Sequence, residues 1–280
     1  MYFESRYHRS LFAILAISAF AMLSCGEPAD ETNNLHPDDR WEPNNPAAWF
    51  TADLDDSIHT SGDSVDRWDD MTGNFDAVNE SGQSAPEKSS VDGRPSIYLD
   101  EDALQLSDAG DIFRNREQFA IFAIYQPDVD QNLPSIIFYN SLPGGNGFRR
   151  ATMEYHTEEE GVFLGARRND SDEIFRFKSE DTAALGEPLA QINEFDHTND
   201  EGRIFLNGGD PTVESPFLGT GPTSDTSSTG TYIGAPDAPD PRRIEELHLH
   251  ELIVYQELPS QDEIDAFFEH ANSHWNVDVE

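Results

Sequence analysis

The feature that most constrains how this chain can fold is a succession of short apolar runs separated by clusters of Gly, Asp, Asn and Ser. The pattern begins at Ala47, and little helical spacing interrupts it. Many short strands without intervening helices are typical of an antiparallel sandwich or barrel. We therefore predict that residues 46–280 form one all-β domain, an antiparallel β-sandwich. The expected strands are Ala48–Thr51, Ser96–Leu99, Gln118–Tyr125, Ser135–Tyr139, Ala151–His156, Val162–Arg167, Glu173–Lys178, Gly202–Leu206, Thr231–Ile233 and His248–Tyr255.

A single helix is predicted near the C-terminus. Ser260 follows Pro259 and precedes Glu263 by three residues, which is the spacing of a capping box. The apolar residues that follow recur at helical spacing and form one stripe, so we expect this helix to pack on the sandwich rather than to enter a membrane. The stripe consists of Ile264, Phe267, Phe268, Ala271 and Trp275.

Four stretches carry a resemblance to a known family. They are Ala48–Asp53 (AWFTAD), Val65–Asn74 (VDRWDDMTGN), Gly93–Asp100 (GRPSIYLD) and His250–Val277 (HELIVYQELPSQDEIDAFFEHANSHWNV). These stretches are similar to segments of the laminin-G-like, concanavalin A-like lectin and glucanase domains that are common in bacterial secreted proteins. The resemblance implies a concanavalin A-like jelly roll. It does not choose a function, because one fold can carry binding, catalytic and adhesive sites.

The N-terminus has the features of an export signal. Arg6 and Arg9 precede an apolar run at Leu11–Leu23, which is too short to span a bilayer as a helix but suits the core of a signal peptide. The letters AMLSCG that follow resemble a bacterial lipobox, in which a signal peptidase cuts before a cysteine that is then lipidated. We therefore predict a signal peptide at residues 1–24 and a lipidated Cys25, which is the only cysteine of the chain.

Residues 25–45 are rich in Pro, Asn, Asp and Glu and contain almost nothing to bury, so we expect a flexible acidic tether there. Together with Cys25, this tether predicts an exported lipoprotein at the bacterial outer membrane or cell surface, which touches the membrane through its lipid anchor only. The alternative is an ordinary secretory signal that happens to contain a cysteine.

The chain is strongly acidic, because 55 Asp and Glu residues face 17 Lys and Arg residues and give a formal net charge of −38. Such a surface repels phosphate backbones, so we exclude nucleic acid as a partner. The scarcity of lysine and the excess of carboxylates favour a halophilic protein, in which salt screens the repulsion between carboxylates. An acidic secreted protein from an ordinary habitat is the alternative.

No motif for bond chemistry stands out in the sequence. Glu263, Asp265 and Glu269 superficially resemble the acidic motif of concanavalin A-like glucanases, whose carboxylates project from alternate residues of a strand into one cleft. Here the predicted helix removes these residues from any such strand. There is also no Gly-x-Ser-x-Gly elbow, no phosphate loop and no cysteine nucleophile. We therefore predict that the protein is not an enzyme and needs no cofactor.

Two predicted hairpins define a core face and a polar face. If the chain turns at Glu158–Gly161 and again at Asn169–Asp172, the side chains of the three strands alternate between an apolar face and a polar face. The predicted core pairs are Tyr155 with Leu164 and Phe177, and Met153 with Ala166 and Phe175.

The polar face is the predicted ligand-binding site, in a segment that holds six cations of this acidic chain. Phe163 offers a ring for stacking on a sugar, while Arg167 and Arg176 offer bidentate contacts to a carboxylate or sulfate. The alternative is that these cations only neutralise the surrounding acids. The predicted ligand-binding residues are Glu154, His156, Phe163, Arg167, Arg176 and Lys178.

A structural calcium site is predicted in the turn that follows the letters VDRW. Asp69, Asp70 and Asn74 lie with Gly73 in one turn, and their side-chain oxygens are the ligands that Ca²⁺ prefers. The resemblance points the same way, because laminin-G-like domains often carry such a site at the rim of the sandwich. The alternative is that Asp pairs are simply frequent in a chain with 55 carboxylates.

These observations together predict a surface-anchored, non-catalytic module that binds a carbohydrate, acidic polysaccharides included, through a sheet face. Two alternatives stay open. A glycan-active hydrolase or lyase on the same scaffold would show paired carboxylates projecting from adjacent strands of the concave sheet. A structural or adhesion protein would contact other proteins through its loops.

Overall fold

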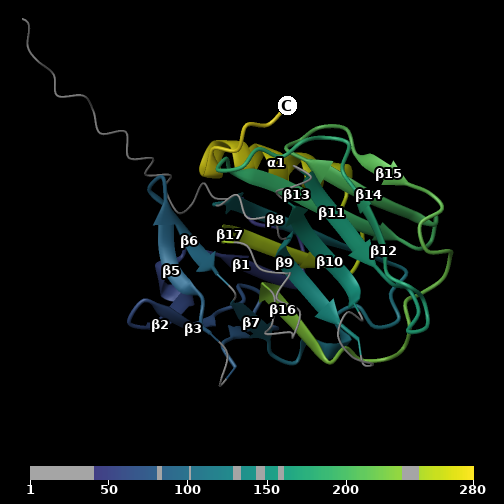
Figure 1. Ribbon diagram of the computed structural model, residues 1–280, viewed down its shortest axis with the longest axis horizontal. Coiled ribbons are helices and arrows are strands. Elements are labelled where there is room, and N and C mark those ends of the chain that lie inside the picture. The colour runs from purple at the N-terminus through teal and green to yellow at the C-terminus, as the bar shows by residue number, and fades with distance from the viewer. Residues whose placement is uncertain are drawn as a thin grey trace, which may run out of the picture. The chain divides into compact units, whose positions relative to one another are not determined.

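A computed structural model describes residues 41–80, 84–100, 102–128, 134–142, 149–156, 161–234 and 246–280. All of these residues belong to one unit, Pro37–Glu280. They form antiparallel strands and one α-helix, which confirms the predicted all-β sandwich with a C-terminal helix (Figure 1).

One sheet, here called the helix-side sheet, is built around two long central strands that pair with each other, β17 (Leu247–Tyr255) and β8 (Gln118–Pro127). Both are almost continuously apolar, as expected for strands that are covered on both faces. The order across the sheet is β1 (Ala48–Thr51), β17, β8, β13 (Leu189–Asp196), β14 (Glu201–Leu206) and β15 (Thr212–Glu214).

The second sheet, here called the far sheet, lies across the core from the first. Its order is β12 (Phe175–Lys178), β11 (Gly161–Ala166), β10 (Arg149–His156), β9 (Pro134–Ser141), β16 (Gly230–Gly234), β7 (Ala103–Leu106) and β4 (Ala77–Val78). Four further strands connect the two sheets. From the far sheet, β4 pairs with β3, and β3 pairs with both β2 and β5. The strand β5 then pairs with β6, which pairs with β17 of the helix-side sheet. These strands are β2 (Ile58–Ser61), β3 (Ser64–Trp68), β5 (Glu87–Val91) and β6 (Arg94–Leu99).

The main core lies between the two sheets. Ile121 and Leu252 from the helix-side sheet and Met153 and Leu164 from the far sheet are fully buried in one cluster. Burying one such side chain contributes about 1.5–3 kcal/mol, whereas an exposed ion pair contributes about 0–1 kcal/mol, so the core rather than the charged surface holds the sandwich together.

The two predicted hairpin registers have different outcomes. Between β11 and β12 the predicted pair of Leu164 and Phe177 is present. Between β10 and β11 the prediction was wrong by two residues, because Met153 lies opposite Leu164 rather than Ala166. The observed pairing runs from Ala151 opposite Ala166 to His156 opposite Gly161. A shift of two residues leaves every side chain on its predicted face.

The helix α1 (Gln261–Trp275) begins where the capping box predicts. The Ser260 side chain accepts a hydrogen bond from the backbone N–H of Glu263, and Asn276 ends the helix in the left-handed conformation with φ of 58°. The apolar stripe of α1 packs on the outer face of the helix-side sheet (Figure 1). The buried cluster there contains Trp49, Ala120, Phe122, Ile124, Ala190, Ile192, Phe205, Ile253 and Tyr255, together with Ile264, Phe267, Phe268, Ala271, Trp275 and Val277.

A buried carboxylate anchors the helix to the sheet. Glu251 of β17 is fully buried. Its Oε1 accepts a hydrogen bond from Trp49 Nε1 at 2.6 Å, and its Oε2 accepts one from Trp275 Nε1 at 2.9 Å. The Nε2 atom of His270 lies 2.8 Å from the same Oε2. Hydrogen bonds to a charged acceptor contribute about 1.5–3 kcal/mol each, so Glu251 fixes where α1 sits on the sandwich.

The predicted signal peptide (residues 1–24), Cys25 and residues 26–40 of the predicted tether lie outside the described residues. The end of the tether is described and is packed on the domain. The Trp41 ring lies 6.0 Å from the ring of Phe267, and the backbone N–H of Asn44 donates to Glu263. No helix in the described part of the chain combines the length and the apolar character that crossing a bilayer requires.

Candidate functional site

The outer face of the far sheet brings four of the six predicted ligand-binding residues together. Glu154 and His156 of β10, Phe163 of β11 and Arg176 of β12 are neighbours across the three strands. Glu154 Oε1 accepts a hydrogen bond from Arg149 Nη1 at 2.6 Å. Glu154 Oε2 accepts a hydrogen bond from Arg176 and lies 3.2 Å from His156 Nε2. We call these five residues the Glu154 cluster.

The Glu154 carboxylate is ionised and balanced by its neighbours. Its exposed fraction is 1%. Burial by itself raises the pKa of Glu154, but the hydrogen bond with His156 and the charges of Arg149 and Arg176 outweigh it and lower the pKa to about 2. A buried carboxylate paired in this way becomes strongly destabilising when one partner is removed. The cluster therefore has a structural role whatever else it does.

Phe163 is not an open stacking platform. Only 8% of the residue is exposed. The ring of His156 lies 4.2 Å from the Phe163 ring, and the Arg176 guanidinium lies over the same ring at 5.4 Å. A sugar could stack on Phe163 only after both side chains had moved, so the stacking role that we predicted for Phe163 is not available in this arrangement.

The other two predicted residues lie at the ends of their strands. Lys178 closes β12 opposite Phe163, and its aliphatic stem crosses Gly161, where a side chain would have no room. Arg167 comes directly after β11, and its backbone N–H donates to the Arg150 carbonyl at 3.2 Å. The acidic-sugar site on this face stays a prediction.

The predicted calcium ligands are engaged in other bonds. Asp70 accepts hydrogen bonds from the backbone N–H groups of Trp49, Thr72, Asn74 and Phe75 and from the Thr72 hydroxyl. Asn74 donates to the Ala47 carbonyl, while Asp69 pairs with Arg67 and His59. Calcium would have to compete with five donors for Asp70. In the described residues no three His, Cys, Asp or Glu side chains are grouped to hold a metal ion, and the calcium site stays a prediction.

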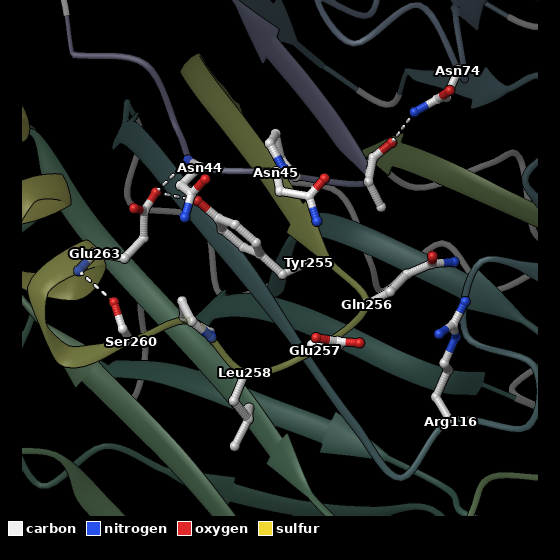
Figure 2. A pocket seen from close by; sticks show the side chains of 13 residues that line it. Asn44, Asn45, Asn74, Arg116, Tyr255, Gln256, Glu257, Leu258, Ser260 and Glu263 are labelled. Atoms are coloured by element: carbon white, nitrogen blue, oxygen red, sulfur yellow. Dashed lines mark hydrogen bonds between the residues drawn. The ribbon is translucent and has the colours of Figure 1, made fainter.

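The described part of the chain has an open polar groove where β17 ends and α1 begins. Two cavities of about 420 Å³ and 470 Å³ adjoin there, and both are lined by Arg116, Gln256, Glu257 and Leu258. Figure 2 shows the residues that line the first of them. We call them together the Arg116 groove. They meet because β17 runs antiparallel to β8, which places the residues after β17 beside the residues before β8. Each cavity has a size typical of ligand pockets.

Arg116 is held by its backbone, while its side chain is unpaired. The Arg116 N–H donates to Thr223 Oγ1 at 2.9 Å, and the Arg116 carbonyl accepts from the Thr223 N–H at 2.7 Å. Among the described residues its guanidinium makes no ion pair or hydrogen bond, and the Nε atom is buried without a partner. In Figure 2 the guanidinium points toward the amide of Gln256. The half-buried guanidinium therefore offers hydrogen-bond donors to the groove.

The remaining lining residues supply further donors and acceptors. Gln256 donates from Nε2 to the Ile112 carbonyl at 2.8 Å, which leaves its amide oxygen for the groove. Glu257 is exposed at the rim (Figure 2). Glu263 is already engaged, because its Oε1 accepts from the Tyr255 hydroxyl at 2.7 Å. The groove thus combines a guanidinium, amides and a carboxylate.

A row of charged side chains lies farther along the same outer face of the helix-side sheet. Glu194 and Asp196 of β13 point the same way, and they face Arg203 and Glu201 of the adjacent strand β14. Arg203 Nη1 donates to Glu194 at 3.1 Å, while Arg203 Nη2 donates to Glu201 and lies 3.9 Å from Asp196 Oδ2. Together with Gln118 of β8, which donates to Asp196 at 3.0 Å, we call these residues the polar row.

The two buried carboxylates of the polar row have pKa values displaced in opposite directions. Burial raises the pKa of Glu194, and the hydrogen bond and charge of Arg203 offset this only in part. Burial would also raise the pKa of Asp196, but hydrogen bonds from Asn199 and Gln118 outweigh it and lower the pKa. The two neighbouring carboxyl groups therefore differ in how readily they take up a proton.

The chain resembles known proteins in fold only. No protein-family model matches it, and no curated protein matches it. Trypanosoma rangeli sialidase in complex with sialic acid is similar with a TM-score of 0.55 at 11% identity, over 81% of this chain and 33% of that chain. The ligand-binding domain of botulinum neurotoxin serotype D, in complex with N-acetylneuraminic acid, is similar with a TM-score of 0.54 at 7% identity, over 80% of this chain and 50% of that chain.

The comparison overturns our expectation that the protein is not an enzyme. Several of the similar structures are sialidases, although this chain spans about a third of their length. The expectation rested on the lack of a local catalytic motif and on a single acid on the predicted face. Asp196 of β13 and Glu201 of β14 lie opposite each other on adjacent strands, whereas Glu194 and Asp196 share one strand.

Sequence reasoning missed the Arg116 groove and the polar row. Arg116 precedes one predicted strand and Glu257 follows another, so pairing those two strands antiparallel would have placed them together. Glu194 and Asp196 lie on β13, which the apolar pattern did not reveal. The alternation of Glu194 and Asp196 at two residues was the available signal.

Proposed function

We propose that this protein binds a glycan in the Arg116 groove. The observation that carries the proposal is the Arg116 guanidinium, which has no partner in the described part of the chain and lines two adjoining polar cavities of a protein with net charge −38. The fold supports a glycan ligand, because similar structures include two described in complex with sialic acids. A laminin-G-like or concanavalin A-like domain, as implied by the sequence resemblance, fits the same proposal.

The chemistry of the groove matches sugar hydroxyl groups. Each hydroxyl both donates and accepts, and neighbouring hydroxyls lie side by side on a ring. Arg116 supplies donors only, Glu257 supplies acceptors only, and the amide of Gln256 supplies an acceptor beside them. Glu117, Glu257 and Glu263 outnumber Arg116 among the lining residues, so the groove favours an uncharged sugar over an anionic one such as the sialic acids of the similar structures. An acidic polysaccharide stays a prediction for the face around Arg176, whose guanidinium is already paired with Glu154.

A binding assay with matched variants tests the proposal. Wild-type protein, Arg116→Ala and Arg114→Ala are applied to a glycan array in high salt. Arg114 is the control because it is an exposed arginine two residues away, is paired with Asp111 and lines neither cavity. We expect Arg116→Ala to lose about tenfold or more in affinity and Arg114→Ala to bind like wild type. Equal binding by all three proteins would refute the groove as the site.

A second candidate function is glycan cleavage at the polar row. Three carboxyl groups gathered around Arg203 on two adjacent strands favour it, and Glu194 is the proposed proton donor. The test is release of reducing sugar from the glycans that bind on the array. We expect Glu194→Gln to abolish release while Glu269→Gln, an exposed position on α1, leaves it unchanged. No release by wild-type protein from any bound glycan would exclude this function.

Export and anchoring complete the proposal. Cys25 carries a lipid and tethers the domain to the outer membrane or cell surface of a bacterium, as the lipobox-like letters favour. Incorporation of labelled palmitate into wild-type protein, but not into Cys25→Ala, is the expected result. Equal labelling of both proteins would contradict it.

A further inference from the structure

We infer that the ligand is an internal stretch of a linear, uncharged glycan chain, which lies across the polar row from the Arg116 groove to a third cavity. This inference rests on the proposed function and adds the class of ligand and a second subsite. It predicts that the protein recognises the repeating body of a polymer rather than only a terminal sugar.

The third cavity lies on the same outer face, on the other side of the first turn of α1. Its volume is about 420 Å³. Phe205, Ile264 and Phe268 lie at its apolar floor, and each of them is at least 90% buried. Gln261 and Asp210 are polar lining residues. An apolar floor with polar groups at its edge suits the two aspects of a sugar ring, which are its C–H face and its hydroxyl rim.

A continuous series of contacts joins this cavity to the Arg116 groove. Gln118 lines the groove and donates to Asp196 at 3.0 Å. Asp196 lies 3.9 Å from Arg203, and Arg203 lines the third cavity. Every contact in this series joins two polar side chains, and Arg203 and Gln118 at its two ends line the cavities.

The polar row is accessible where a chain would cross it. The side chains of Arg203 and Glu201 are 28% and 29% exposed, whereas Glu194 and Asp196 beneath them are almost fully buried. Each sugar unit added across the polar row gains hydrogen bonds without a new association step. Affinity should therefore rise with chain length until the ligand reaches from the Arg116 groove to the third cavity.

Affinity as a function of chain length tests the inference. Cello-, laminari- and chito-oligosaccharides from disaccharide to octasaccharide are titrated into full-length mature protein by calorimetry. We expect the dissociation constant of the series that binds to fall by about tenfold or more between the shortest and the longest ligand. The variant Gln261→Ala combined with Asp210→Ala should remove that gain.

Two controls separate the possible failures. Glu269→Ala changes an exposed residue of α1 that lines none of the three cavities, and it should keep the full dependence on length. If binding requires Arg116 but does not depend on length or on Gln261 and Asp210, the proposed function stands and this inference falls. If no series binds in an Arg116-dependent way, both fall.

Discussion

The burial of His197 predicts how far the free energy of unfolding falls in acid. The residue is fully buried, and neither ring nitrogen has a hydrogen-bond partner among the residues that the structure describes. Its ring is stacked on Phe217 at 5.9 Å and lies 6.1 Å from Phe119. Protonation would place a charge in this apolar pocket, so the folded protein keeps His197 neutral.

The size of the effect follows from the pKa of His197. Burial lowers it from 6.5 to about 4, the charge of Arg168 adds to this, and Asp196, Asp200 and Asp172 oppose it. Between these two pKa values the unfolded chain binds a proton that the folded protein does not bind. The free energy of unfolding is therefore unaffected above about pH 6.5 and falls by about 3 kcal/mol in total as the pH drops to about 4.

Urea unfolding between about pH 8 and pH 4 measures this loss. The variant His197→Phe keeps an aromatic ring in the pocket and removes the titrating group. We expect wild-type protein to lose about 3 kcal/mol more than His197→Phe over this range. If the free energy of unfolding falls equally with pH in wild-type protein and in His197→Phe, then His197 is not responsible for the loss in acid.

Three further predictions concern stability. Glu251→Gln removes the charge that Trp49 and Trp275 share, so we expect its urea midpoint to correspond to a loss of about 2–3 kcal/mol; an unchanged midpoint would contradict the anchoring role. Glu154→Gln leaves the buried charge of Arg149 unbalanced, so it should lower the free energy of unfolding by about 3 kcal/mol in the same assay. A loss below about 0.5 kcal/mol would show that the ion pairs of Glu154 do not stabilise the fold. With a net charge of −38, the melting temperature should rise steeply from low to molar NaCl, and a flat profile would count against a halophilic protein.

Much of the fold can be predicted from local patterns of the sequence. The capping box at Ser260 and the apolar stripe after it place α1 correctly, because both depend only on residues within a few positions. The apolar runs of β8 and β17 are equally clear. The strand β13 escaped prediction, since its core-facing residues include Gln191 and Asn193.

Those polar side chains are buried because distant groups satisfy them. Gln191 accepts from the Tyr125 hydroxyl at 2.7 Å, and Asn193 donates to the Phe163 carbonyl at 3.1 Å. Partners of this kind lie on other strands and cannot be read from the pattern of β13 itself. The Glu154 cluster shows the same limit, because alternation placed Glu154 on the correct face but did not reveal how deeply it is buried.

A crystal structure with the tightest-binding oligosaccharide tests directly whether the Arg116 groove binds the glycan. We expect sugar density in the groove, with hydroxyl groups within hydrogen-bond distance of Arg116 and Gln256, and further sugar units over Arg203. Density confined to the outer face of the far sheet, on Phe163 and Arg176 and away from the groove, would contradict it.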